Sequence, residues 1–319
     1  MLPANELVIG IDGGGSKTVA WIAQCREDDG FAVVGQGSAA GSNPQAVGMA
    51  AALENLAEAV SAARGQAAVE SGPVAAVVVG LAGSCGDDVQ QVIGHWASSR
   101  QLAQRFRVVH DAIPVLAAGS PDGWGVALIS GTGSFAFGQD HQGCSARAGG
   151  WGHILGDEGS GYAIAVAGLR AAARAADQRG PTTRLLDDFL ARLRCSQPSD
   201  LISAIYGARG DAAAIARLSD VVFHAAIHAD AVAQQIVADA ATDLAGLVAA
   251  VATKLGFIGR EFPLAWTGGV LLGNVPLADS LVGRLAKQGL QPWPVVAVPD
   301  PVAGAVRIAV KLRRESNEG

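Results

Sequence analysis

Residues 7–18 read Leu-Val-Ile-Gly-Ile-Asp-Gly-Gly-Gly-Ser-Lys-Thr, an apolar run that ends at Asp12 and passes into three glycines. Glycine lets the backbone adopt positive φ and lets N–H groups approach a ligand, so a loop of this kind can hold an anion. A carboxylate at its mouth indicates Mg²⁺, which is bound by carboxylate and phosphate oxygens together. The stretch therefore predicts a strand followed by a phosphate loop, and an ordinary glycine-rich hairpin turn fits it equally well.

The spacing of this loop excludes two common nucleotide motifs. Ser16 separates Gly15 from Lys17, whereas the Walker motif requires glycine and lysine without an insertion. No dinucleotide-binding GxGxxG pattern can be read either, because Ser16 and Thr18 stand where its last glycine would fall. A second phosphate-binding segment is therefore needed to decide between a ligand loop and a turn.

Composition limits the class of protein. The 319 residues predict two domains, and a net charge of −6 argues against a nucleic-acid partner. We find no signal-peptide pattern and no apolar run near the ~20 residues that span a bilayer, so we expect a cytoplasmic protein without a membrane partner. The four cysteines form no CxxC pair and no zinc-type spacing, so we expect free thiols at Cys25, Cys85, Cys144 and Cys195.

Strand-like and helix-like segments alternate along the chain, which predicts an α/β fold with parallel strands. Strand candidates lie at residues 7–11, 19–24, 33–37, 74–81, 107–110, 125–130, 135–138, 264–267 and 295–298. Helix candidates lie at residues 45–64, 87–99, 113–118, 159–178, 183–193, 211–226, 230–255, 276–288 and 301–313. The order strand, glycine-rich turn, strand occurs at 7–24 and again at 125–138, so we expect two related lobes.

The second glycine-rich turn, Ser130-Gly-Thr-Gly-Ser134, carries two glycines and three hydroxyls between apolar strands. Alone it is an ordinary hairpin turn, but beside residues 12–18 it predicts the other half of a phosphate clamp. A third glycine pair, Gly268 and Gly269, follows the strand candidate that ends at Thr267. A pair of glycines there lets a ribose or a flat ring approach the backbone.

Asp111 follows the apolar strand candidate 107–110, and strand ends of this kind line the ligand crevice of α/β sheets. Its carboxylate could accept a proton in phosphoryl transfer, or it could simply cap the next helix. The densest motif is residues 148–162, where seven of fifteen residues are glycine. Trp151 offers a sugar an aromatic face, and Asp157 can bind hydroxyls, so we expect a shaped loop that enters a helix near Ser160.

The ordered set of motifs resembles the sugar kinases of the actin, heat-shock ATPase and hexokinase superfamily. It is most similar to the N-acetylglucosamine kinase group, in the family that also holds the ATPase activators of benzoyl-CoA reductase. The specific pieces are residues 149–159 and 129–134. The resemblance covers residues 6–310. It implies two actin/ribonuclease H-like lobes facing an ATP-binding cleft, at residues 1–115 and 116–300, with a helix and tail at 301–319 that pack back on the first lobe.

The resemblance also implies the ligands and their residues. Asp111 corresponds to the catalytic base and Asp12 lies near Mg²⁺. ATP and its phosphates are assigned to Gly13, Gly14, Gly15, Ser16, Lys17, Thr18, Gly131, Thr132, Gly133, Thr267, Gly268 and Gly269. The sugar is assigned to Asn43, Asp111, Ser134, Gly150, Trp151 and Asp157.

The activity implied is ATP-dependent phosphorylation of an amino sugar, N-acetylglucosamine to its 6-phosphate, by a homodimer. Phe135 and Pro44 stand where the mammalian enzymes carry Asn and His, so other amino sugars, glucosamine and N-acetylmuramic acid, stay open. An ATPase that activates a partner redox enzyme is the alternative, although no cysteine lies in an obvious iron–sulfur loop. A sugar-sensing regulator without turnover is a weaker alternative, because Asp111 is present.

Overall fold

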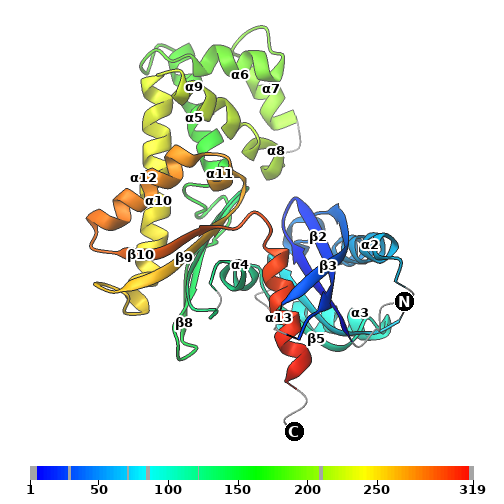
Figure 1. The fold of residues 1–319 in the computed structure, drawn as a ribbon. Helices are drawn as coiled ribbons and strands as arrows, with labels where there is room; N and C mark the ends of the chain where they lie inside the picture. The colour runs from blue at the N-terminus through cyan, green and yellow to red at the C-terminus, as the bar shows by residue number, and fades with distance from the viewer. Residues whose placement is uncertain are drawn as a thin grey trace. The chain divides into compact units, whose positions relative to one another are not determined.

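The structure is a computed structural model, and it describes residues 6–27, 30–69, 72–83, 87–120, 122–207 and 211–315. Cys85 and the tail from residue 316 lie outside these ranges. The chain forms two compact units (Figure 1). We call Met1–Trp124 with Val298–Gly319 the first unit, and Gly125–Ala297 the second unit. Each unit holds a five-stranded sheet with helices, which confirms the predicted α/β class.

The sheet of the first unit has the strand order β3-β2-β1-β4-β5. Its members are β1 (Leu7–Gly13), β2 (Lys17–Cys25), β3 (Phe31–Ala40), β4 (Val74–Leu81) and β5 (Ala103–His110). The first three strands are antiparallel, whereas β4 and β5 run parallel to β1. The helices of this unit are α1 (Pro44–Val47), α2 (Met49–Ala67), α3 (Asp87–Ser99), α4 (Ala112–Gly119) and α13 (Val302–Arg314).

Both faces of the first sheet are covered, because alternate residues of a strand point to opposite sides. Leu7, Ile9 and Ile11 pack with residues of α2 and α3 on one side. Val8 packs with Val306 and other residues of α13 on the opposite side. A helix from the end of the chain thus completes the core that begins at residue 7.

The sheet of the second unit has the strand order β10-β9-β6-β7-β8. Its members are β6 (Gly125–Ser130), β7 (Ser134–Gln139), β8 (Ser145–Gly149), β9 (Glu261–Thr267) and β10 (Gln291–Ala297). As in the first unit, three antiparallel strands are joined to two parallel ones. The predicted duplication of a β-hairpin that opens a parallel sheet is confirmed.

The second unit is rich in helices. They are α5 (Gly161–Ala176), α6 (Leu185–Leu193), α7 (Asp200–Gly207), α8 (Ala212–Ala216), α9 (Ser219–Ile227), α10 (Ala231–Lys254), α11 (Gly269–Leu272) and α12 (Val275–Lys287). The predicted single helix over 211–226 is wrong, because α8 and α9 are separate helices. The strand β8 and the helices α7 and α11 have no counterpart among the predicted segments, and the predicted single helix over 45–64 is divided into α1 and α2.

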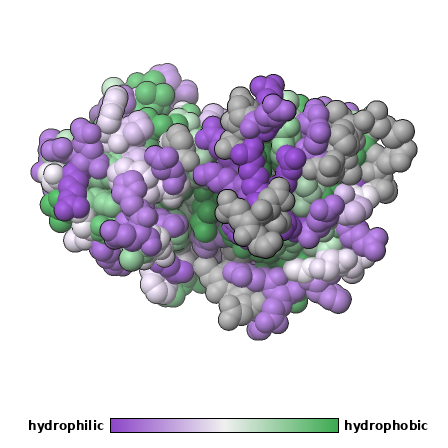
Figure 2. Space-filling model, turned by 60° about the horizontal axis from the view of Figure 1, so that its bottom comes forward, coloured by the Kyte–Doolittle hydropathy of each residue, from purple (hydrophilic) through white to green (hydrophobic). Residues whose placement is uncertain are grey.

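Among the described helices, α10 alone has the length and composition to cross a membrane. A core helix of a soluble protein passes the same test, and α10 packs against β7, β8, α9 and α12. We therefore assign α10 to the core of the second unit. On the coloured part of the face drawn in Figure 2, hydrophilic residues are mixed with smaller apolar areas.

Candidate functional site

The predicted first phosphate loop is the turn between β1 and β2. The Gly14 amide donates to the Lys17 carbonyl at 3.0 Å, which closes the hairpin. The Gly14 carbonyl accepts the amides of Ser42 at 3.0 Å and Asn43 at 3.2 Å. These bonds hold the loop by its backbone, while the tip residues from Gly15 to Lys17 remain exposed.

The base of this loop is tightly packed, and its tip is open. A Cβ at Gly13 would collide with the Ser42 hydroxyl and with Leu81, whereas a Cβ at Gly15 would meet nothing within 4 Å. The buried Thr18 hydroxyl lies 2.6 Å from the Ala40 carbonyl oxygen and 2.9 Å from the Ser42 Oγ. Thr18 thus ties β2 to the segment after β3, and its predicted contact with a phosphate stays a prediction.

Asp111 lies directly after β5, at the edge where the parallel strands β1, β4 and β5 end. It occupies the N-cap position of α4, but its side chain makes no capping hydrogen bond. Oδ1 is buried and has no hydrogen-bond partner among the described residues. It lies 2.6 Å from the His110 Nδ1 without hydrogen-bond alignment. A buried carboxylate oxygen left in this state can accept a proton from a ligand hydroxyl.

Asp12 lies at the same edge, one residue before the end of β1. Its pKa is raised to about 7, mainly by burial and then by the negative charges of Asp111 and Asp300, while the charge of Lys17 lowers it. Asp300 precedes α13 and was missed by the sequence analysis. The signal was available, because Asp300 follows a predicted strand and precedes a predicted helix, as Asp111 does.

These carboxylates fit a magnesium ion that arrives with a nucleotide. Mg²⁺ keeps several waters and is usually held by one or two carboxylates and by substrate phosphates. The described residues contain no group of three or more His, Cys, Asp or Glu that could hold a metal by itself. A divalent cation beside Asp12 would also offset the repulsion among Asp12, Asp111 and Asp300.

Asn43, a predicted sugar residue, begins α1. Its Oδ1 accepts the Gln45 amide at 3.0 Å, so the side chain caps the helix. A Cβ at Gly83 would collide with this Oδ1, which packs the segment after β4 against Asn43. The Asn43 amide is bonded to the first phosphate loop at the Gly14 carbonyl, while its side chain caps α1 and packs against Gly83.

The predicted second phosphate loop is the turn between β6 and β7, and side chains tie it to the glycine-rich loop before α5. The Ser130 hydroxyl donates to the Gly159 carbonyl at 2.9 Å, and the Ser134 hydroxyl donates to the Glu158 carbonyl at 2.6 Å. The Gly161 amide donates to the Gly131 carbonyl at 2.8 Å. We call residues 149–160 the sugar loop, and it cannot shift without disturbing the second phosphate loop.

Asp157 is the centre of the sugar loop. It has a φ of +60°, in the left-handed region. A Cβ at Gly133 would lie 2.6 Å from its Oδ2, so the carboxylate rests on the second phosphate loop. The pKa of Asp157 is raised, mainly by burial and also by the negative charge of Glu158. Backbone hydrogen bonds from Gly152 and Ser134 and the charge of His153 lower it in part.

Trp151 and Gly150 begin the sugar loop next to β7. The Gly150 amide donates to the Ser134 carbonyl at 3.0 Å. A Cβ at Gly150 would lie 2.7 Å from the Phe135 ring, so Phe135 packs on the loop backbone. The Trp151 side chain is 65% exposed and can therefore offer its ring to a ligand.

The predicted adenosine motif lies beside the second phosphate loop. Thr267 ends β9 and pairs with Ile129 of β6. Gly268 has a φ of +100°, and a Cβ there would overlap the Ser130 carbonyl. The second unit therefore brings Gly131–Ser134, the sugar loop and Thr267–Gly269 together, as the first unit brings together residues 12–18, Asn43 and Asp111.

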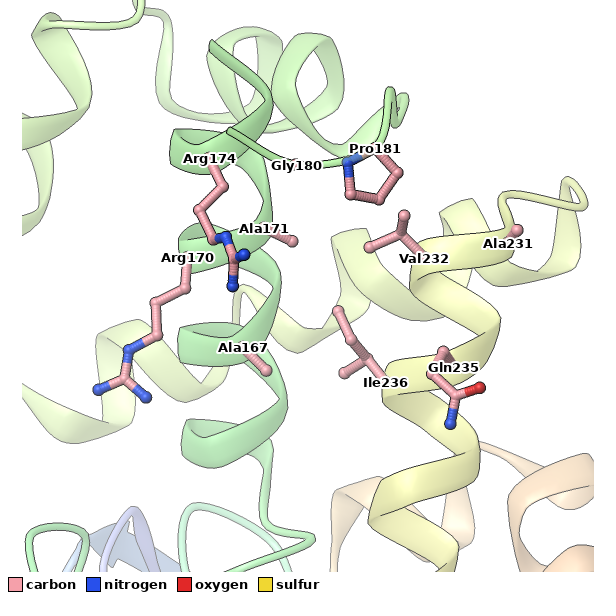
Figure 3. A pocket seen from close by; sticks show the side chains of 10 residues that line it. All are labelled: Ala167, Arg170, Ala171, Arg174, Gly180, Pro181, Ala231, Val232, Gln235 and Ile236. Carbon is pink, nitrogen blue, oxygen red and sulfur yellow. The ribbon is translucent and has the colours of Figure 1, made fainter. Parts of the chain in front are cut away.

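A separate groove in the second unit lies between α5 and α10 (Figure 3). Ala167 and Ala171 of α5 face Val232 and Ile236 of α10, and the side chains of Arg170 and Arg174 also line the groove. Its lining residues include none of the predicted site residues and no carboxylate.

Comparisons with known proteins agree with these motifs. Residues 9–309 match the BadF/BadG/BcrA/BcrD ATPase family. The chain is 35% identical over 266 residues to the N-acetylmuramic acid/N-acetylglucosamine kinase of Clostridium acetobutylicum, covering 83% of this chain and 86% of that protein. It is 30% identical over 326 residues to the N-acetyl-D-glucosamine kinase of Dictyostelium discoideum, covering 98% of this chain and all of that protein.

Two solved structures share the fold. A protein of Chromobacterium violaceum has a TM-score of 0.77 and 24% identity, covering 97% of this chain and 100% of the other. The ROK family glucokinase of Streptomyces griseus has a TM-score of 0.56 and 17% identity, covering 97% and 99%. These likenesses confirm the predicted actin/ribonuclease H-like architecture.

Proposed function

The chain belongs to the BadF/BadG/BcrA/BcrD ATPase family, and we propose that it transfers the γ-phosphoryl group of ATP to N-acetylglucosamine, giving the 6-phosphate. The chain is a sugar kinase, as its two kinase relatives are. N-acetylglucosamine is the substrate named for both, which supports it here. The kinase relatives also favour this function over the alternative of an ATPase that activates a redox enzyme.

The observation that carries the proposal is the Asp111 carboxylate. Its Oδ1 is buried, lacks a hydrogen-bond partner among the described residues, and does not cap the helix that follows. In phosphoryl transfer to an alcohol, a carboxylate in this state orients the hydroxyl and accepts its proton as the oxygen attacks the phosphorus. We assign this role to Asp111.

The remaining residues bind the two substrates. The loops Gly13–Lys17 and Gly131–Gly133 contact the phosphates, and Thr267–Gly269 contacts the adenosine. Asp12 holds Mg²⁺, which neutralises phosphate charge when bound. The sugar is bound by Asn43, Ser134, Gly150, Trp151 and Asp157.

The proposal also includes the location of the protein and its oligomeric state. A cytoplasmic location is supported by the free Cys25, Cys144 and Cys195 among the described cysteines. A homodimer is implied by the family resemblance alone, and light scattering of the purified protein would test it.

A coupled ADP-release assay tests the function. Purified protein would be given ATP·Mg²⁺ with N-acetylglucosamine, glucosamine, N-acetylmannosamine, N-acetylmuramic acid or glucose, and the product hydroxyl would be assigned by NMR. The proposal predicts the highest kcat/KM with an N-acetylated amino sugar. ADP release that no sugar stimulates would reject it and would favour the ATPase alternative.

A further inference from the structure

Two histidines lie one helical turn apart at the end of α9 in the second unit. The segment reads His224-Ala-Ala-Ile-His228, and side chains four residues apart lie on the same face of a helix. His228 is the C-cap of α9, and its amide donates to the His224 carbonyl at 3.2 Å, so the last turn includes both residues. Their ring centroids are 4.2 Å apart, and both residues are exposed.

A second hydrogen bond determines which nitrogen of His228 can bind a ligand. The His228 Nδ1 lies 2.8 Å from the His224 carbonyl oxygen. A carbonyl oxygen can only accept, so Nδ1 carries the proton, and the lone pair of the neutral ring is on Nε2. Histidines that bind a metal have this arrangement, in which one ring nitrogen binds the ion and the other donates to a carbonyl or carboxylate. His228 is therefore held in the tautomer of a metal ligand.

The separation of the two rings fits a single metal ion. Zn²⁺ binds imidazole nitrogens at about 2.0–2.1 Å, so two nitrogens on one tetrahedral ion are about 3.3 Å apart. Rotation about the χ angles of exposed side chains can bring the nitrogens of neighbouring rings to this separation. The His-Glu-x-x-His motif binds zinc with the same spacing on a helix. Ala225 stands in the place of its Glu, so the general base of that motif is missing here.

The position on the helix favours a cation. The C-terminal end of a helix carries the negative end of its dipole, and the two histidines lie at this end of α9. Asp220 lies one turn before His224 on the same helix, is exposed, and adds a negative charge to this face. The charges of the helix end and of Asp220 both attract an ion of charge +2.

We propose that His224 and His228 together bind one divalent transition-metal ion, with water in its remaining coordination positions. Imidazole suits Zn²⁺, Ni²⁺ and Cu²⁺, whereas Mg²⁺ prefers oxygen ligands. The site therefore differs in chemistry from the magnesium site proposed at Asp12, and neither histidine belongs to the proposed ATP or sugar site. The bound ion links the side chains of the last turn of α9 and stabilises the folded second unit.

Calorimetric titration of the full chain with Zn²⁺, without nucleotide or sugar, tests the proposal. His224→Ala and His228→Ala should each weaken Zn²⁺ binding at least about tenfold, because loss of an outer partner of a ligand alone costs about 10- to 100-fold. The matched control is His95→Ala, an exposed histidine of α3 with no histidine one turn away, and it should change the affinity less than about twofold. Zn²⁺ bound elsewhere, such as at the exposed Cys144, would be common to all variants. Equal affinities in the wild type and both alanine variants would overturn the proposal.

The variant His228→Asn separates metal binding from a structural role of the histidine. The Asn amide can donate to the His224 carbonyl as Nδ1 does, but it places no nitrogen at the position of Nε2. It should therefore keep the urea midpoint of the metal-free protein and lose the Zn²⁺ affinity. Zn²⁺ should raise the wild-type midpoint, because an ion that binds only the folded state stabilises it. A rise of the same size in His228→Asn would contradict the site.

Electron paramagnetic resonance with one equivalent of Cu²⁺ tests direct coordination. The wild-type spectrum should show hyperfine splitting from two imidazole nitrogens, and the His224→Ala spectrum should show splitting from one. Identical nitrogen splitting in the two proteins would place the ion elsewhere and overturn the proposal. The ADP-release rate with ATP·Mg²⁺ and sugar should be unchanged in His224→Ala, so the outcome for the metal site is independent of the proposed kinase activity.

Discussion

The two glycine-rich hairpins occupy the same place in two sheets of the same strand order, yet they are held differently. The β1–β2 turn is fixed by backbone hydrogen bonds to the Gly14 carbonyl. The space around Gly15 is open, because a Cβ there would meet nothing within 4 Å. The β6–β7 turn is bound through Ser130 and Ser134 to the sugar loop and is covered by Asp157. One hairpin has an open tip, and the other is coupled to a second loop.

The difference indicates that the two hairpins have different functions. The open hairpin lies at the sheet edge that carries Asp12 and Asp111, where charge is the dominant feature. At the closed hairpin, the hydroxyls of Ser130 and Ser134 and the backbone at Gly133 fit the sugar loop against the turn. Substitutions at the first hairpin should therefore change kcat and the pH dependence of stability. Substitutions at the second hairpin should change the KM for the sugar.

The largest effect is expected at the first hairpin's edge. Asp111→Asn removes the proposed proton acceptor but keeps the side-chain shape, so kcat should fall about 10²- to 10⁴-fold. The KM for ATP should stay within about threefold. Asp122→Asn, an exposed aspartate of the same unit, is the control. Turnover near the wild-type value in Asp111→Asn would show that Asp111 is not the base. It would also contradict the different functions of the two hairpins.

The second prediction concerns the charge at the same edge. The folded-state pKa of Asp12 is about 7, above its ordinary value of 3.8. The folded state therefore holds more protons than the unfolded state between these values, and stability falls as pH rises from about 4 to about 7. Without Mg²⁺ and nucleotide, the loss should be on the order of 1–3 kcal/mol, because Asp12 is only partly buried.

Urea unfolding of wild type and Asp12→Asn, compared at pH 5 and pH 8, would measure this effect. The variant should be the more stable protein at pH 8 and should lose most of the pH dependence in that range. Added Mg²⁺ with a nucleotide should stabilise the wild type and not the variant. A wild type that gains stability from pH 5 to pH 8 would contradict the charge cluster.

Particular segments show how much of this could be predicted from the sequence. The hairpins at 7–24 and 125–138 were correct because apolar strands and glycine turns are local signals. Strand β8 was missed because Ser-Ala-Arg-Ala-Gly has no β-branched residue, and its pairing with β7 decides its conformation. The break between α8 and α9 was missed because the alanine-rich sequence favours a continuous helix.

For a similar reason, some residues of the candidate site were predicted from the sequence and others were missed. Asp12 and Asp111 follow apolar strands and could be recognised from local pattern. The effect of Asp300 on Asp12 depends on α13 packing against β1, which is a contact between the two ends of the chain.

The third prediction tests the coupling of the second hairpin directly. Gly133→Ala would push the Asp157 carboxylate, whereas Gly15→Ala would meet nothing within 4 Å. We expect the KM for the sugar to rise about tenfold in Gly133→Ala, since a displaced hydrogen-bonding carboxylate costs of order 1–2 kcal/mol. Gly15→Ala should leave it within about twofold. Equal sugar KM values in the two variants would show that Asp157 does not depend on the second hairpin.

The smallest effect should come from two buried hydroxyls, one near the start of the second strand of each hairpin. Thr18 is bonded to Ala40 and Ser42, and Ser134 is bonded to Glu158. Removing either hydroxyl should lower the free energy of unfolding by about 1–2 kcal/mol, because a buried carbonyl loses a donor. Thr18→Val and Ser134→Ala would be compared by urea unfolding, with Thr18→Ser as a control that keeps the hydroxyl.

The same two variants should differ in their kinetics. Ser134→Ala should raise the sugar KM a few-fold, because the Ser134 hydroxyl holds the sugar loop at the Glu158 carbonyl. Thr18→Val should change the KM for ATP less than about twofold, since its hydroxyl is already engaged within the protein. An ATP KM that rises tenfold or more in Thr18→Val, with unchanged stability, would assign Thr18 to the phosphates and would show that the first hairpin rearranges when ATP binds.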